Sequence, residues 1–379
     1  MSRLPGNPQG EAGMGESDVT ARQKFECPSC GSDAHWNPSQ SALVCPYCGT
    51  TSPAKLDPQT GSVEENDLVA ALRGLPPERR GWDAVRLSVL CQSCKAVSVL
   101  AKERVAQKCE FCGSAQIVPQ DQIRAPIRPE SVLPFKIAES RVRESVKVWF
   151  GTRWFAPNRL KKAAVTDTIK GVYLPYWTFD ALAHADWTAE AGYYYYETET
   201  FRDSNGQSQT RRVRKTRWQW ASGAVEHFFD DALVAASKAA DPGLLSKIEP
   251  FPTKELVPYD AGYVAGWVVE QYQIDLIAAA QHSRERMVDE MESKCASAVP
   301  GDTQRNLRVK VAFSRQTFKH TLLPVWLLTY NYGGKSYQVL VNGDSGAIAG
   351  KRPWSYAKVF FLVLAIVASG LLIALAARS

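Results

Sequence analysis

Hydrophobic and polar positions divide the chain into segments of different kinds. Residues 1–24 are polar and contain several Pro, Gly and Ser residues, a composition typical of a disordered terminus. In the body, 133–355, apolar residues recur with helical spacing at 138–150 and at about 259–298, and sequence with strand-like alternation follows each stretch. Residues 359–377 contain neither a charged residue nor a proline. The pattern predicts a mixed α+β body followed by one apolar helix.

The apolar run 359–377 is long enough for a membrane span. At about 1.5 Å per residue it forms a helix of about 28 Å, close to the thickness of the hydrocarbon core. More Lys and Arg residues precede this run than follow it, which favours a cytoplasmic body. We therefore expect a single-pass transmembrane tail anchor at 356–379, with the lipid bilayer as a partner and the bulk of the chain cytoplasmic. The residues expected at the membrane interface are Lys351, Arg352, Trp354, Tyr356 and Lys358.

The body contains a short internal repeat. Residues 168–177 read TIKGVYLPYW and residues 317–326 read TFKHTLLPVW, with Thr, Lys, Leu, Pro and Trp at equivalent positions. A helical pattern precedes each copy and β-rich sequence follows it. Two explanations remain open at this point: a duplicated helix-then-strand unit, or a coincidence of strand chemistry.

Two cysteine arrays with the same spacing lie 64 residues apart near the N-terminus. In each array two C-x2-C turns can direct four thiolates at one point, which is the ligand set of a structural zinc site. Gly follows the second Cys in three of the four turns, and Lys95 follows it in the fourth. The N-terminus has no apolar secretory segment, which disfavours a disulfide framework. The predicted ligands of two structural Zn²⁺ ions are Cys27, Cys30, Cys45, Cys48, Cys91, Cys94, Cys109 and Cys112.

Local charge disfavours nucleic acid as the partner of these ribbons. Each site with four thiolates carries a net charge of about −2, because the thiolates outweigh the divalent ion. Two sites lower the formal net charge of the chain from +6 to +2. The first ribbon contains Glu26 and Asp33 but no Lys or Arg, so its net charge with zinc is about −4. A surface of this sign repels phosphate.

One basic stretch, 211–217, lies in a predicted hairpin. Asn205-Gly206 separates two alternating runs and predicts a two-residue loop. In that register Glu197 faces Arg214 and Glu199 faces Arg212, so we expect the acidic strand to neutralise the basic strand. Binding of nucleic acid or of anionic lipid by this stretch is the alternative.

The chain lacks the motifs of the common enzyme classes. It has no G-x4-G-K-[ST] phosphate loop, no G-x-G-x-x-G and no H-E-x-x-H. The run 343–346, GDSG, imitates the nucleophile loop of a serine protease, but no His lies in a catalytic context, which favours a tight turn between strands. The sequence therefore predicts a protein that is not an enzyme.

Several motifs resemble those of a bacterial family with zinc ribbons of the TFIIB type. They are WFAP at 154–157, LPYWTFDA at 174–181, TFKH-LLPVW at 317–326 and VNG-G from 341. Members are often labelled primosomal protein N′ (replication factor Y), superfamily II helicase, although this chain lacks the ATP-binding loop of a helicase. The resemblance implies zinc-ribbon membrane proteins with flotillin-like (SPFH-domain) partners.

We therefore expect a non-enzymatic, tail-anchored adaptor whose zinc ribbons recruit a protein partner to the cytoplasmic face of the membrane. The aromatic residues Trp36, Tyr47 and Phe111 lie between ligands and are candidates for partner contact, although packing against the ribbon would explain each of them as well. A nucleic-acid-binding protein of replication or transcription is the alternative, and its binding would fall steeply with salt.

The expected domains follow from these segments. They are a disordered N-terminus at 1–24, rubredoxin-like zinc ribbons at 25–52 and 90–119, linkers at 53–89 (with a short helix) and 120–132, the α+β body at 133–355 and the tail anchor at 356–379.

Overall fold

The computed structural model describes most of the chain from Cys27 onward. The described residues are 27–51, 63, 65–73, 87–93, 95–100, 109, 111, 114, 117–120, 127–154, 169–202, 207–332 and 335–376. The predicted disordered terminus at 1–24 lies outside these ranges, as do Cys94, Cys112 and the predicted turn Asn205-Gly206.

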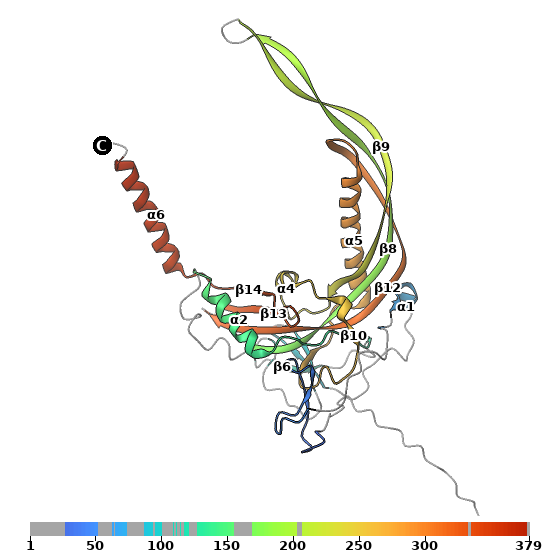
Figure 1. Ribbon diagram of the computed structural model, residues 1–379, viewed down its shortest axis with the longest axis vertical. Helices are drawn as coiled ribbons and strands as arrows, with labels where there is room; N and C mark the ends of the chain where they lie inside the picture. The colour runs from blue at the N-terminus through green and yellow to red at the C-terminus, as the bar shows by residue number, and fades with distance from the viewer. Residues whose placement is uncertain are drawn as a thin grey trace, which may run out of the picture.

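Three very long strands dominate the body. Strand β8 (Ile169–Arg202) pairs antiparallel with β9 (Ser208–Ala235) on one side and with β12 (Thr303–Tyr332) on the other. Globular proteins use strands of about five or six residues on average, so these three are exceptional. Figure 1 shows them bending upward together from the base of the molecule.

Shorter elements complete one large sheet and its cover. The other strands of the sheet are β3 (Asn66–Asp67), β4 (Leu87–Cys91), β5 (Val97–Leu100), β6 (Ile117–Gln120), β7 (Ser131–Val132), β10 (Val257–Pro258), β11 (Val268–Glu270), β13 (Lys335–Asn342) and β14 (Ile348–Gly350). A separate two-stranded sheet holds β1 (His35–Asn37) and β2 (Ala42–Val44). The helices are α1 (Leu68–Arg73), α2 (Glu139–Gly151), α4 (Pro242–Ile248), α5 (Leu276–Ala298) and α6 (Tyr356–Ala376), with one 3-10 turn at Thr253–Glu255.

The predicted α+β class is therefore wrong, because the described residues form a mostly β protein around one large sheet. Helices do precede the long strands, as the spacing of apolar residues suggested. The second helix begins only at Leu276, where Asp275 accepts a hydrogen bond from the backbone N–H of Ala278 at 2.8 Å. Part of the stretch from 259 that looked helical instead forms β11, whose apolar residues pair with β8 and β5.

The two copies of the repeated motif lie side by side and run antiparallel. Leu174 pairs with Leu323, and both occupy the seventh position of their motif. Trp177 pairs with His320, and Trp326 pairs with Gly171, so the tenth position meets the fourth in both directions. The two copies are thus related by a local pseudo-two-fold axis at the Leu174–Leu323 pair.

The same symmetry extends to the segments around the motif. The indole N–H of Trp177 donates to Ile274 O at 2.9 Å, and that of Trp326 donates to Ile137 O at 3.1 Å. Each acceptor lies just before a helix, α5 in one case and α2 in the other. Strand β11 runs parallel to β8 as β7 runs parallel to β12. The body therefore contains two units with the same order of elements, β7–α2–β8–β9 and β11–α5–β12–β13.

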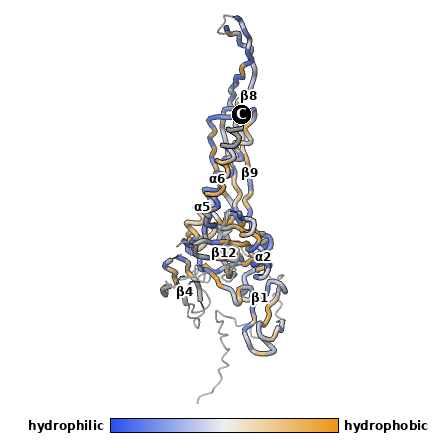
Figure 2. Tube along the Cα trace, turned by 90° about the vertical axis from the view of Figure 1, so that its left-hand side faces the viewer, coloured by the Kyte–Doolittle hydropathy of each residue, from blue (hydrophilic) through white to orange (hydrophobic). Residues whose placement is uncertain are grey.

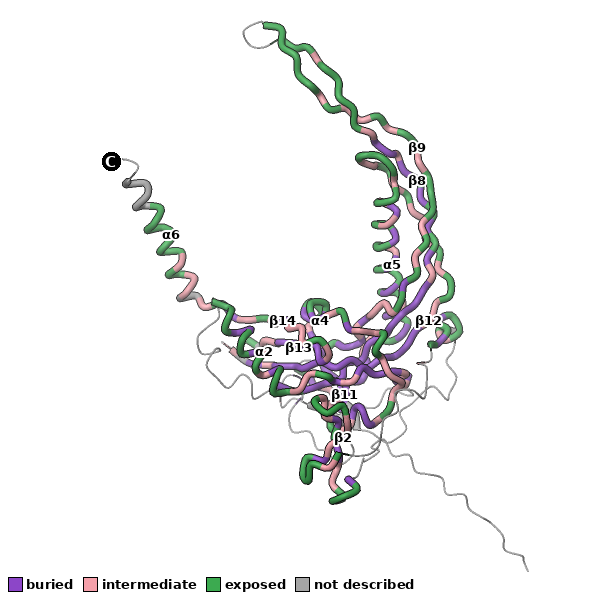
Figure 3. The backbone as a smooth tube through the Cα atoms, viewed as in Figure 1, coloured by how far each residue is buried: buried purple, intermediate pink, exposed green. Residues whose placement is uncertain are grey.

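The core of the second unit lies between α5 and the bend of the long strands. Met287, Met291 and Cys295 on α5 are buried against Trp187 and Phe229 of the hairpin. Alternate residues of β8 from Ala181 to Ala191 face this helix and are buried, while the residues between them are mostly exposed, as Figure 3 shows along the bend. Helix α5 thus supports the lower half of the β8–β9 hairpin.

The upper half of this hairpin extends beyond its support. Strand β12 begins at Thr303, which pairs with Gly192, so residues 193–202 and 208–217 form a two-stranded ribbon that we call the arm. Figure 1 shows the arm projecting from the body, and in Figure 2 most of it is hydrophilic. Its register differs by one residue from the predicted one: Glu197 faces Val213 and Glu199 faces Arg211.

The described part of helix α6 contradicts the predicted membrane span. The apolar run does form a helix, Tyr356–Ala376, whose side chains are described only as far as Gly370. Among the residues that the structure describes, no helix is both long and apolar enough to cross a membrane. This finding contradicts the predicted tail anchor at 356–379 and the single-pass membrane localisation, while the lipid bilayer as a partner stays a prediction.

Candidate metal centre and polar cluster

The first cysteine array forms one compact cluster. The ligand atoms of Cys27, Cys30, Cys45 and Cys48 all lie within 4.8 Å of one another. Cys27 Sγ lies 3.4 Å from Cys48 Sγ, and Cys30 Sγ lies 3.5 Å from Cys45 Sγ. A tetrahedral zinc ion with Zn–S bonds of about 2.3 Å separates its sulfurs by about 3.8 Å, so the spacing fits such an ion. These four cysteines could hold one metal ion.

The backbone of each turn explains why the sulfurs converge. Gly31 N–H donates to Cys27 O at 2.8 Å, and Gly49 N–H donates to Cys45 O at 3.0 Å. Both glycines have a φ of +72°, a left-handed conformation that other residues adopt at a cost. Each turn therefore wraps back over its own pair of sulfurs. One turn precedes β1 and the other follows β2, so the hairpin brings the two sulfur pairs together.

Hydrogen bonds within the cluster lower the pKa of three thiols. The backbone of Ser32 lowers the pKa of Cys30, and the hydroxyl of Thr50, 3.1 Å from the sulfur, lowers that of Cys48. The pKa of Cys27 is also lowered, because backbone hydrogen bonds outweigh its burial. At Cys45 the backbone of Cys48 lowers the pKa, but burial and the neighbouring thiols raise it to about 11. A divalent cation would supply the charge that lets all four ionise.

Half of the second array lies within the described residues. Lys95 N–H donates to Cys91 O at 2.9 Å and Cys91 N–H donates to Ala96 O at 2.9 Å, as in the turns of the first array. Lys95 has a φ of 64°, so it adopts the left-handed conformation that glycine provides in the other turns. Cys109 N–H likewise donates to Ser114 O at 2.7 Å. Cys94 and Cys112 lie outside the described residues, so the structure shows one complete four-cysteine site.

The three aromatic residues predicted to contact a partner occupy different environments. The Trp36 side chain is buried, with its ring 4.9 Å from Tyr263 and its N–H directed at Phe135 O, 3.3 Å away. Phe111 is buried in the core, where Thr329 donates to its carbonyl oxygen at 2.5 Å. The Tyr47 side chain is 82% exposed. Packing against the body therefore accounts for Trp36 and Phe111, and Tyr47 alone presents its ring to solvent.

The residues predicted at a membrane interface lie where the body meets α6. Lys351 forms an ion pair with Asp241 beside α4, and Lys358 Nζ donates to Trp154 O at 2.9 Å. Trp354 is 57% exposed, with the Arg352 guanidinium 5.9 Å from its ring centre. The side chain of Tyr356 lies outside the described residues. Two of these basic residues thus connect parts of the body.

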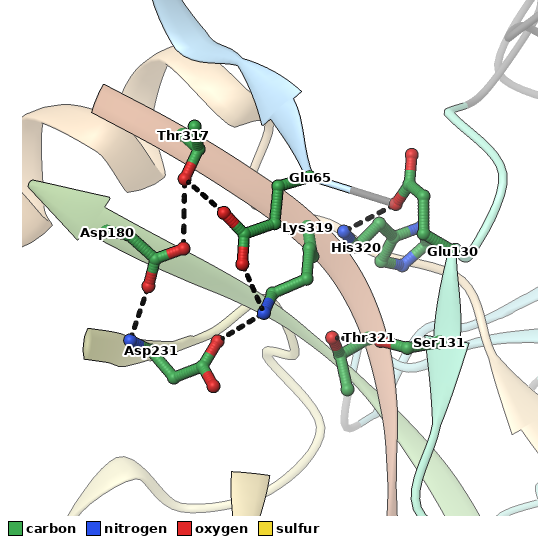
Figure 4. Close-up of polar contacts among 9 residues, drawn as sticks. All are labelled: Glu65, Glu130, Ser131, Asp180, Asp231, Thr317, Lys319, His320 and Thr321. Atoms are coloured by element: carbon green, nitrogen blue, oxygen red, sulfur yellow. Dashed lines mark hydrogen bonds and ion pairs between the residues drawn. The ribbon is translucent and has the colours of Figure 1, made fainter. Parts of the chain in front are cut away.

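A polar cluster marks one place where the two units of the body differ. Figure 4 shows Lys319 on β12 directed at two carboxylates: Nζ lies 2.7 Å from Asp231 Oδ1 and 3.3 Å from Glu65 Oε1. The Thr317 hydroxyl lies 3.0 Å from Glu65 Oε2 and 2.9 Å from Asp180 Oδ2. Asp180 in turn accepts from the backbone N–H of Asp231, at 2.5 Å. The equivalent of Lys319 in the first unit is Lys170, whose side chain is exposed.

His320, next to Lys319, is fully enclosed. Glu130 Oε2 accepts from the backbone N–H of His320 at 2.6 Å, and the ring atom Nδ1 lies 3.0 Å from Ile127 O. Rings of Trp177 and Tyr272 flank the imidazole. Burial lowers the pKa of His320 to about 4, so the ring is neutral at pH 7 and Nδ1 carries the proton. The equivalent residue of the first unit is Gly171, where the Trp267 ring fills the space of a side chain.

The contacts of this cluster hold distant segments of the chain together. Burial opposes the charge on Lys319, but its contacts with Asp231, Asp180 and Glu65 prevail and raise its pKa, so the amine stays protonated. Burial raises the pKa of Asp180. Together the contacts bind Glu65, in the segment before β3, and Glu130, in the segment before β7, to the long strand β12.

The sequence signals for this cluster were weak. The sequence predicts a short helix in the linker 53–89, but Glu65, near its start, bonds to Thr317 and Lys319 of β12 rather than to the helix. The backbone N–H of Ala70 in α1 instead donates to Asp67 Oδ1 at 2.7 Å. Comparison of the two motif copies provides one signal in the sequence. The fourth position of the motif is His320 in one copy and Gly171 in the other, which marks it as a place where the copies differ.

Comparison with known proteins adds one relative. The chain is 27% identical over 345 residues to the uncharacterized protein YdjG of Bacillus subtilis (strain 168), and the match covers 88% of this chain and 91% of that protein. No protein-family model matches the chain, and no solved structure matches it. The resemblance to the TFIIB-type zinc-ribbon family labelled as a helicase therefore stays a prediction.

Proposed function

We propose that this protein is a non-catalytic adaptor whose first zinc ribbon, 27–51, docks a protein partner. The observation that carries the proposal is the contrast between Trp36 and Tyr47 on that ribbon. Trp36 ties one side of the ribbon to the body, while Tyr47, between the ligands Cys45 and Cys48, is 82% exposed. A large aromatic ring held outward on a rigid turn is the kind of residue that dominates protein interfaces.

Rigid presentation supports the same proposal. The backbone hydrogen bonds of the Cys45–Gly49 turn and the four converging sulfurs hold Tyr47 in place. A side chain that is already ordered loses little conformational entropy when a partner binds. The acidic character of the ribbon favours a partner with a basic or neutral docking surface.

The proposal includes two structural Zn²⁺ ions. The second ion rests on the repeat of the turn geometry at Cys91 and Cys109, including the left-handed Lys95. Cys91 and Cys109 are buried with Phe111 in the core, so this ribbon would anchor the N-terminal half to the body. Elemental analysis of purified protein tests this: we expect two zinc ions per chain, one lost in Cys27→Ser and the other lost in Cys91→Ser. One zinc in the parent protein would contradict the second site.

Affinity purification tests the docking role. Tagged full-length protein is recovered from nuclease-treated lysates and compared with Tyr47→Ala, with Cys45→Ser/Cys48→Ser and with the control Trp354→Ala, which removes another exposed ring. We expect defined proteins to be lost in the first two variants and kept in the control. A flotillin-like protein, the class that the sequence resemblance implies, is the first to look for among them. Identical recovery by all four proteins would overturn the proposal.

A further inference from the structure

The register of the arm separates its charges by face. Residues that pair across the two strands point to the same face, and neighbours along a strand point to opposite faces. One face, which we call the outer face, carries Tyr194, Tyr196, Thr198, Thr200, Arg202, Ser208, Thr210, Arg212, Arg214 and Thr216. The opposite face carries Glu197 and Glu199, which form ion pairs with Lys215 and Arg211. All acidic residues of the described arm therefore lie on the opposite face.

The outer face has an unusual composition. Each of its ten residues is an arginine, a tyrosine, a threonine or a serine. These are the side chains that contact the phosphates of nucleic acids, through guanidinium or hydroxyl groups. Apart from Thr216, all of these side chains are exposed, including Tyr196 at 56%. The face carries three arginines and no carboxylate.

Two of the three arginines of this face, Arg212 and Arg214, are held in place by rings rather than by carboxylates. The guanidinium of Arg214 lies 4.3 Å from the ring centre of Tyr194, and that of Arg212 lies 4.8 Å from that of Tyr196. Within the described residues neither arginine forms an ion pair. Stacking orders the guanidinium and leaves its N–H groups free to donate to an anion. Because no carboxylate of the described residues pairs with them, their charge is available to a partner.

The shape of the arm selects the kind of anion. Ten residues at about 3.3 Å each give a ribbon of about 33 Å, close to one turn of duplex DNA. The major groove of B-DNA is wide enough for a two-stranded β-ribbon, whereas that of duplex RNA is too narrow for side chains. Strand β12 stops at Thr303, so no third strand widens the arm. The positive charge of the outer face and the length and width of the arm thus both fit duplex DNA.

We propose that the outer face of the arm binds duplex DNA in its major groove, mainly through the phosphate backbone. The site goes beyond the docking role of the zinc ribbon and does not depend on it. Its contacts are charged and hydroxylic, so binding has little sequence preference and weakens steeply with salt.

A face-matched pair of variants provides the test. Arg212→Gln/Arg214→Gln removes two charges from the outer face, and Arg211→Gln/Arg217→Gln removes two charges from the opposite face. The full chain, each variant and Tyr47→Ala are titrated against a labelled mixed-sequence DNA duplex of about three helical turns, with fluorescence anisotropy as the readout. Duplex RNA of the same length and vesicles with anionic phospholipid are parallel probes.

We expect the outer-face variant to bind DNA about tenfold more weakly at moderate salt and to lower the slope of log K against log salt by about two. The opposite-face variant is expected to change affinity by less than about threefold, and Tyr47→Ala to bind as the parent does, which keeps this result separate from the docking test. Equal loss in both double variants would show general charge attraction and overturn the proposal. Absence of duplex DNA binding, or binding to RNA or vesicles in preference to DNA, would overturn it as well.

Discussion

Leu174 and Leu323 pair with each other across β8 and β12, each at the seventh position of its own copy of the repeated motif. Their pairing places the two copies around a pseudo-two-fold axis, with Trp177 and Trp326 making equivalent bonds to the segments before α5 and α2. A position at which the two units differ therefore identifies a feature that only one unit has. One such difference sets a polar cluster with His320 and Lys319 against an apolar position with Gly171.

Gly171 is required by the ring that covers it. A Cβ atom at this position would lie 2.1 Å from the Trp267 ring, which stacks on Phe135 in the core. We expect Gly171→Ala to lower the free energy of unfolding by about 1–3 kcal/mol, as other overpacked cores do. Gly151→Ala, where nothing lies within 4 Å, is the control and should be neutral or slightly stabilising. Thermal unfolding measures both. Equal midpoints for the two variants would contradict the packing argument.

Lys319 stabilises the fold through its buried carboxylate partner. Its side chain is 8% exposed and that of Asp231 is 9% exposed, so removal of the amine leaves a buried carboxylate unpaired. We expect Lys319→Met to cost about 3–5 kcal/mol. The symmetry-related Lys170→Met removes an exposed amine and should cost less than about 1 kcal/mol. Urea unfolding of both variants gives the comparison. If the two losses are similar, the buried pair does not contribute as argued.

His320 makes stability depend on pH. Burial lowers its pKa to about 4 in the folded protein from the ordinary 6.5, so the unfolded chain binds more protons between these values. Its contribution to stability is therefore present above pH 6.5 and is lost as the pH falls toward 4, by about 3 kcal/mol. His320→Gln removes the titrating group. The difference between the two unfolding free energies should change over this interval, and a constant difference would show that His320 does not titrate there.

Removal of zinc should unfold the first ribbon before it unfolds the body. Structural zinc contributes about 10–16 kcal/mol in small zinc modules, whereas the body has its own core. We expect a chelator to free Trp36 from Tyr263 and Phe135 without unfolding the β sheet. Tryptophan fluorescence compared between the parent protein and Trp36→Phe isolates this ring, and circular dichroism follows the sheet. Simultaneous loss of both signals would mean that the ribbon and the body unfold as one unit.

The cysteine spacing by itself determined the candidate metal site, because the cysteines of each turn lie within four residues of one another. Cys27, Cys30, Cys45 and Cys48 converge as predicted, and even the departure at Lys95 keeps the same turn. Helices before the repeated motif could also be read from local periodicity, although the start of α5 could not, because β11 is held by pairing with distant strands.

Only the tertiary structure decided the rest, because it depends on contacts between residues distant in sequence. The Lys170 and Lys319 copies look alike in the motif, yet one is exposed and the other buried beside Asp231. Among the candidate aromatic residues, burial distinguishes Tyr47 from Trp36 and Phe111. In the arm, a shift of one residue in the pairing places Arg212 and Arg214 on the outer face, away from Glu197 and Glu199. Strand register is a collective property of the whole sheet, so no local pattern could have placed those charges.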